Sequence, residues 1–206
     1  MARRTKEEAE QTKQAVIRSA LDLFYEKGFV RSTFDDIAKR INLTKGAVYW
    51  HFRNKADLLT EIIRQEFQKK EETLPCKGAE FKNISDLREY FIAVSKAIET
   101  DADFCKFLRF LIFQMEWSER VRDHILKQLT DLIDTPWIEL KERLTFMQKS
   151  GEIPSDVNIE DLTILLSCLW RGTVDSYITK RYPMSLSVTF IQGFDMLFAG
   201  LKVEKK

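Results

Sequence analysis

Apolar residues recur every three or four positions along nearly the whole of this chain, which is the period of an amphipathic helix. In the first third of the sequence, Phe34, Ile37 and Ile41 lie at i, i+3 and i+7. Thr33 can cap the start of this helix, and Asp36 follows three residues later, close to a capping box in which Glu or Gln is usual. The pattern predicts a short helix that begins after Thr33.

A second short helix is predicted directly downstream. Asn42 breaks the period, Thr44 offers another N-cap, and Val48 and Phe52 then share one face over about two turns. A helix, a tight turn and a short helix predict a helix-turn-helix over about residues 33–52. The second helix of such a unit enters the major groove of DNA with its N-terminus first, so its exposed first turn can touch base edges.

The residue types of this second helix suit contact with DNA. Lys45 can donate to guanine or to a phosphate, while Gly46 and Ala47 let the backbone approach closely. The Ala47 methyl can also meet a thymine methyl. Tyr49 and His51 can reach phosphate oxygens, so five positions of the helix are candidate DNA contacts.

The neighbouring aromatic residues Trp50 and Phe52 are expected to pack inward, and the alternative that Tyr49 also belongs to the core stays open. A further helix is predicted from Asn54, whose side chain can cap it. Lys55 lies in the first turn of that helix, where free N–H groups and the helix dipole favour a phosphate. Lys55 is therefore a candidate phosphate ligand.

The helical period continues to the end of the chain, and no strand signal interrupts it. Apolar stripes predict helices over about residues 54–73, 87–98, 104–115, 118–149, 158–180 and 187–201. Pro136 interrupts one of these stripes, because proline removes a backbone donor and clashes with the preceding turn. A kink is expected there, or two helices with Thr135 as N-cap and Pro136 as the first helical residue.

Charge divides the chain, although the net charge of all 206 residues is only +1. Residues 1–70 carry 15 Lys or Arg against 10 Asp or Glu, whereas residues 71–206 carry 18 against 22. The basic excess thus lies at the end with the predicted helix-turn-helix, as a nucleic-acid-binding protein requires. The basic start at Arg3, Arg4 and Lys6 is either a mobile arm on the duplex or a solvated tail.

Catalytic and metal-binding chemistry has no support in the sequence. The three cysteines, Cys76, Cys105 and Cys168, lack metal-ligand spacing, and neither a disulfide nor a zinc site is expected. His51 and His124 are isolated, and no nucleophile motif or phosphate-binding glycine loop occurs. No catalytic residue, metal site or cofactor is predicted. No apolar run approaches the ~20 residues of a membrane span, so we expect a cytoplasmic protein.

Residues from about 8 to 70 resemble the N-terminal DNA-binding domain of the TetR family of bacterial repressors. Residues 44–55, Thr-Lys-Gly-Ala-Val-Tyr-Trp-His-Phe-Arg-Asn-Lys, are similar to the branch that includes the AcrR-type regulators of multidrug efflux. Ala20-Leu-Asp-Leu-Phe24 followed by Gly28-Phe29, and Thr33-Phe-Asp-Asp-Ile-Ala38, extend the resemblance. The remaining two thirds carry no motif of comparable strength.

The resemblance implies an all-α fold of about nine helices, with a DNA-binding domain over residues 8–70 and a helical ligand-binding and dimerisation domain over residues 71–206. It also implies a homodimer that binds a palindromic operator in double-stranded DNA, without a cofactor and in association with the bacterial nucleoid. The positions assigned to DNA are Thr33, Thr44, Lys45, Gly46, Ala47, Tyr49, His51 and Lys55.

The last two predicted helices are apolar on more than one face. In the family, the corresponding helices of two subunits form a four-helix bundle. Gly172, Gly193 and Gly200 suit the close approach of another helix, although a monomer core with tolerated glycines is the alternative. The residues predicted for the dimer interface are Trp170, Val174, Ile191, Phe194, Leu197 and Phe198.

A cavity for a small-molecule effector is expected from the family between the inner helices. The candidate lining residues are Phe67, Phe110, Phe113, Gln114, Glu116, Trp117, Trp137, Trp170 and Asp175. Carboxylates beside aromatic rings suit a lipophilic cation, while for each residue core packing or a surface ion pair is the alternative. Two functions follow: a repressor that a hydrophobic ligand releases from its operator, or a DNA-binding protein whose C-terminal domain docks a protein partner.

Overall fold

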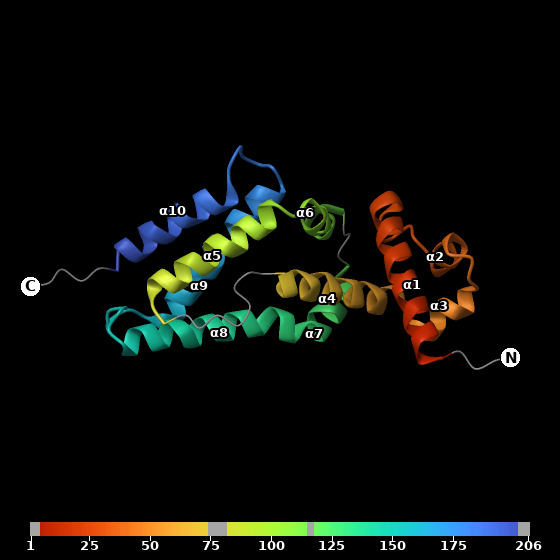
Figure 1. Ribbon diagram of the computed structural model, residues 1–206, viewed down its shortest axis with the longest axis horizontal. Helices are drawn as coiled ribbons and strands as arrows, with labels where there is room; N and C mark the ends of the chain where they lie inside the picture. The colour runs from red at the N-terminus through yellow and green to blue at the C-terminus, as the bar shows by residue number, and fades with distance from the viewer. Residues whose placement is uncertain (1–4, 74–81, 115–117, 202–206) are drawn as a thin grey trace, which may run out of the picture. The chain divides into compact units, whose positions relative to one another are not determined.

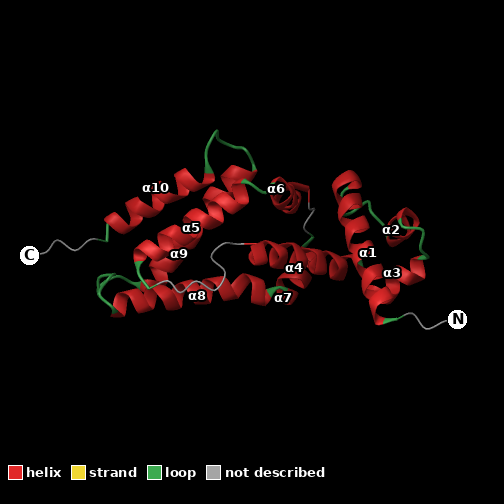
Figure 2. Ribbon diagram, viewed as in Figure 1, coloured by secondary structure: helices red, strands yellow, loops and turns green. Residues whose placement is uncertain are grey.

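The computed structural model describes residues 5–73, 82–114 and 118–201, and every regular element in these ranges is a helix (Figure 2). The elements are α1 (Lys6–Lys27), α2 (Phe34–Arg40), α3 (Lys45–His51), α4 (Lys55–Thr73), α5 (Ile84–Glu99), α6 (Ala102–Arg109), the π-helical segment η1 (Phe110–Gln114), α7 (Glu119–Gln128), α8 (Thr130–Lys149), α9 (Ile159–Ile178) and α10 (Leu186–Ala199). The all-α prediction is confirmed, with ten α-helices in the described ranges against about nine expected. A search of the described helices finds none with the length and apolar character to span a bilayer.

Two compact units make up the chain. The first contains residues 1–68 together with 110–130, and the second contains residues 69–109 together with 131–206. The first unit therefore takes in η1 and α7, which come from the middle of the sequence. The predicted functional boundary near residue 70 stays a prediction.

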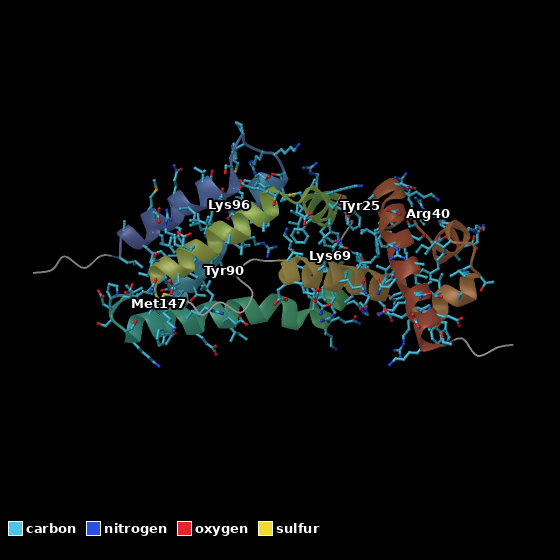
Figure 3. All side chains as sticks on the ribbon, viewed as in Figure 1. Tyr25, Arg40, Lys69, Tyr90, Lys96 and Met147 are labelled. Atoms are coloured by element: carbon cyan, nitrogen blue, oxygen red, sulfur yellow. The ribbon has the colours of Figure 1, made fainter. Side chains whose placement is uncertain are left out.

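Local capping explains where the helices of the first unit begin and end. Thr5 and Glu8 form a capping box at the start of α1, and Gly28, with φ of 83°, ends it. Thr33 and Asp36 form the predicted capping box of α2. Arg40, labelled in Figure 3, holds α2 to α1 through paired hydrogen bonds of 2.7 and 2.8 Å to Glu26.

The middle of the chain departs from the prediction at two points. The segment predicted to kink at Pro136, or to divide there into two helices, divides instead at Leu129, where the backbone leaves the helical region and α7 ends. Pro136 lies inside the continuous helix α8, because the single hydrogen bond that a proline removes need not end a helix. The next correction is smaller: α6 passes into the wider η1 at Phe110 rather than continuing as one α-helix.

In the second unit, α5, α9 and α10 lie side by side and bury a common core (Figure 1). The centre of this core is aromatic, with 4.7 Å between the ring centroids of Phe91 and Phe190. Gly193 lets α10 approach α9 closely, since a Cβ there would lie 3.0 Å from Leu169 Cδ1. The buried core residues are Leu87, Phe91, Leu144, Met147, Ile153, Leu162, Leu166, Phe190, Ile191, Phe194 and Phe198.

Candidate nucleic-acid interface

A tight turn joins α2 to α3, as a helix-turn-helix requires. Asn42 adopts a left-handed conformation with φ of 53°, and the Leu43 N–H donates back to the Ala38 carbonyl at 2.9 Å. Thr44 then caps α3, its Oγ1 accepting from the Ala47 N–H at 3.3 Å. The predicted helix-turn-helix is present, with α2 and α3 packed on each other and on α1 (Figure 1).

The buried face of α3 is set by Val48, which is fully inaccessible. At 100° per residue, Gly46 and Trp50 fall on the opposite side of the helix. Trp50 is 73% exposed, so the prediction that it packs inward is wrong. Phe52 is buried as predicted, because the backbone becomes extended at this C-cap residue and turns the ring inward.

Lys45 and Tyr49 occupy one flank of the exposed face. The Lys45 ammonium lies 5.7 Å from the centroid of the Tyr49 ring, and that ring meets Phe34 of α2 edge to face at 4.9 Å. Tyr49 is nevertheless 50% exposed. The contact with α2 thus orients an aromatic ring whose other side is open to a partner.

Lys55 is engaged inside the first unit rather than presented to solvent. Its Nζ donates to the carbonyls of Phe29 and Val30 at 2.7 and 2.9 Å, and it lies 4.7 Å from the centroid of the Phe29 ring. Burial lowers the pKa of this ammonium. In the protein alone Lys55 therefore ties the loop between α1 and α2 to α4, and its role as a phosphate ligand stays a prediction.

Thr33, His51 and Asn54 also lie in this region, and each contacts a neighbouring residue of the first unit. The Thr33 hydroxyl donates to the Asp36 carboxylate at 2.7 Å, in addition to capping α2. His51 is half-buried, with its ring 4.5 Å from that of Trp50. Asn54 caps α4 as predicted, since its Oδ1 accepts from the Asp57 N–H at 2.9 Å.

Helix α7 packs beside the first half of α4, a contact that no local pattern in the sequence indicates. His124 Nε2 lies 2.7 Å from Asp57 Oδ1, in the first turn of α4. Arg64 donates to the Gln128 carbonyl at 2.7 Å, near the end of α7. Two polar contacts therefore hold α7 along α4 within the first unit.

The predicted effector residues are divided between the two units. Phe110 belongs to the first, where its ring centroid lies 5.5 Å from that of Tyr25, and the partly exposed Phe67 belongs to it as well. Trp170, in the second unit, packs on Phe190 at 5.0 Å, and Asp175 is exposed. The remaining candidates, whose side chains lie outside the described residues, are Phe113, Gln114, Glu116, Trp117 and Trp137. The effector pocket stays a prediction.

Half of the predicted dimer residues lie inside the core of one chain. Ile191, Phe194 and Phe198 are buried in the core of the second unit, where α5 covers them, so their side chains are not available to another subunit. Trp170, Val174 and Leu197 are half-buried. The exposed apolar stripe, by which we mean the outward residues of α9 and α10, consists of Ile164, Leu165, Cys168, Val188 and Met196.

A family model of known proteins matches the N-terminal part of the chain. Residues 16–62 match the family model of bacterial regulatory proteins, tetR family. The HTH-type transcriptional regulator TtgR of Pseudomonas putida is 48% identical over 63 residues, which are 31% of this chain and 30% of that protein. The family model therefore covers the second half of α1, the helix-turn-helix of α2 and α3, and the start of α4.

Similarity over the whole length is weaker but extends across both units. The probable acrEF/envCD operon repressor of Escherichia coli (strain K12) is 29% identical over 182 residues, covering 86% of this chain and 81% of that one. The crystal structure of NalD, the secondary repressor of the MexAB-OprM multidrug efflux pump in Pseudomonas aeruginosa, superposes with a TM-score of 0.75 at 21% identity. That match covers 98% of this chain and 100% of NalD, and it shows a shared fold.

Proposed function

We propose that the chain is a DNA-binding transcriptional regulator of the TetR family. It represses an efflux operon as a homodimer on a palindromic operator, until a hydrophobic small molecule releases it. The observation that carries the DNA-binding part is the open face of α3. Lys45 and Tyr49 are exposed on it, and no residue of α3 is acidic. The names of the relatives, an operon repressor and an efflux-pump repressor, support the regulated gene class.

Binding is tested with DNA from the chromosomal region upstream of the gene itself. Lys45→Ala should weaken binding and relax specificity at one position of each half-site, because it removes a base-directed donor. Tyr49→Phe keeps the ring against Phe34 and removes only the hydroxyl, which can reach a phosphate. It should therefore lower the affinity for all DNA sequences by a similar factor. Gel-shift titrations measure both, and unchanged melting temperatures show that the fold is intact. Full affinity in both variants would contradict the assignment of this face.

The exposed apolar stripe supports the homodimer. Leu165 is 56% exposed and Met196 74%, and Gly172, on the same side of α9, has open space where a Cβ would lie. Apolar groups that water contacts in one chain gain free energy when a second copy covers them. A two-fold dimer also presents two copies of α3 to the half-sites of a palindrome.

Sedimentation equilibrium tests this interface. Leu165→Glu and Met196→Glu should give folded monomers, because each places an unpaired charge in an apolar contact. Phe146→Glu is the matched control, since Phe146 is similarly exposed but lies on α8, outside the stripe. A wild-type protein that is monomeric would instead support the alternative, in which the stripe docks a different protein.

Release by a ligand is supported by the way α4 is held at its far end. In the second unit, Lys70 Nζ donates to the Ala97 carbonyl at 2.6 Å and to Asp101 at 3.0 Å, at the corner between α5 and α6. Since α4 is one continuous helix, a ligand that displaces this corner also displaces the end that begins at Lys55. DNA presents half-sites at fixed spacing, so a small change in the separation of the two copies of α3 costs specific contacts.

Spin labels on α3 of each subunit test the release mechanism. The probe is tetraphenylphosphonium, a lipophilic cation that suits a pocket with aromatic walls and a carboxylate. If the probe abolishes operator binding, the distance distribution between the labels should shift. Loss of binding with an unchanged distribution would refute the proposed movement of α4.

A further inference from the structure

Trp50 is placed in an unusual way for a tryptophan. It lies opposite the buried Val48, and its neighbour in ring contact is His51, at a centroid distance of 4.5 Å and an interplanar angle of 90°. An indole is one of the largest apolar surfaces a side chain can bury, and leaving it in water forfeits that contribution. A tryptophan at the centre of an open helix face therefore marks a surface that a partner covers.

The chemistry of α3 restricts what that partner surface can be. Base edges are distinguished by side chains that form paired hydrogen bonds, namely Arg or Lys with guanine and Asn or Gln with adenine, or by Asp and Glu that accept from cytosine. Of these residue types α3 contains only Lys45, which can read one guanine. The remaining surface is the Ala47 methyl and the rings of Tyr49 and Trp50. The apolar group that the major groove offers to such a surface is the C5 methyl of thymine.

Gly46 makes room for this contact. A Cβ at Gly46 would meet only Thr44 Oγ1, at 3.8 Å, so packing within the chain does not require a glycine there. Glycine is unfavourable inside a helix, and its presence is explained if the duplex approaches at this point. Trp50 lies one turn later on the same face, and helical side chains lean toward the N-terminus. The space above Gly46 is therefore within reach of the indole.

We propose that Trp50 is a specificity-determining residue that packs on the methyl groups of one or two thymines in each operator half-site, across the gap left by Gly46. The proposal rests on the proposed function, because it needs an operator for α3 to enter. It defines the chemistry of that operator: thymines at the centre of each half-site are recognised by their methyl groups rather than by hydrogen bonds.

The test begins with selection of an operator from a random double-stranded pool by the full-length protein. Each thymine of the selected half-site is then replaced singly by deoxyuridine, which removes the C5 methyl and keeps base pairing unchanged. One or two replacements should weaken wild-type binding by about four-fold each, the contribution of one buried methyl-sized group. In Trp50→Ala, overall affinity should fall and the same replacements should have no further effect.

Tyr49→Phe is the matched control, because it changes the other exposed aromatic residue of α3 and should leave the deoxyuridine penalties as they are in the wild type. Trp50→Ala should melt at the wild-type temperature, and a large decrease would overturn the proposal by showing a structural role. Equal deoxyuridine penalties in the wild type and in Trp50→Ala, or no penalty in the wild type, would also overturn it. A selection that enriches no sequence at all would instead contradict the proposed function.

Discussion

Replacing Lys55 by methionine separates two roles for this residue, as an internal cation and as a phosphate ligand. The substitution keeps the aliphatic length but leaves the Phe29 and Val30 carbonyls without their donor. A hydrogen bond to a charged group contributes about 1.5–3 kcal/mol, and the bond to Val30 is more exposed than the bond to Phe29, so it contributes less. The expected loss is therefore about 2–3 kcal/mol of unfolding free energy. For a chain of this size that lowers the melting temperature by roughly 5–10 °C.

The measurements are a thermal melt followed by circular dichroism and a gel-shift titration of the same sample. Arg53→Met is the matched control, because Arg53 is an exposed cation two residues earlier in the chain. The control should melt like the wild type. If Lys55→Met also melts like the wild type but no longer binds the operator, the ammonium serves the DNA phosphate after all and the reasoning from its hydrogen bonds is refuted.

Three further predictions concern the second unit. Burial alone would raise the pKa of Glu99, but hydrogen bonds from Ser185 and the start of α10 outweigh it and lower the pKa below its ordinary value. The stability that these bonds contribute is fully present above the ordinary pKa and is lost as pH falls through the lowered one. In urea melts over a range of acidic pH, Glu99→Gln should flatten this dependence, and an unchanged slope would count against the assignment. Gly193→Val should cost about 1–3 kcal/mol by overpacking against Leu169, measured by urea denaturation; an unchanged midpoint would show that α9 can move aside. Phe194→Glu should give unfolded protein by circular dichroism, and a folded monomer would return Phe194 to the subunit interface.

Helix starts can be predicted from the sequence because the groups that form a cap lie within three residues of one another. Thr33, Thr44 and Asn54 are each identifiable in this way, and each caps the expected helix. The direction in which Trp50 points cannot be predicted with the same security. Valine and three aromatic or imidazole rings crowd a helix of seven positions, so several choices of inward face have similar apolar content.

Contacts between distant parts of the sequence cannot be predicted from local patterns, because such patterns do not identify the distant partner. Lys55 binds carbonyls 25 and 26 residues earlier, and nothing in a local pattern identifies a carbonyl that lacks a donor. In α10 two faces are apolar, and the packing of α5 decides which one is buried. The sequence therefore predicts that Phe194 is important for assembly of the helices but not that the assembly lies within one chain.

Because α7 belongs to the first unit, that unit cannot fold completely early in synthesis and cannot be transferred to another protein as residues 1–68 alone. Residues 110–130 complete the unit that begins at residue 1, and His124 contacts the first turn of α4. During synthesis the nascent helix-turn-helix unit is thus without part of its support until the ribosome has passed residue 130. For the same reason, a chimera joined near residue 70 would combine one protein's α4 with another protein's α7. A chimera that keeps the native stability of the DNA-binding unit must therefore include residues 110–130 from the same protein as α1 to α4.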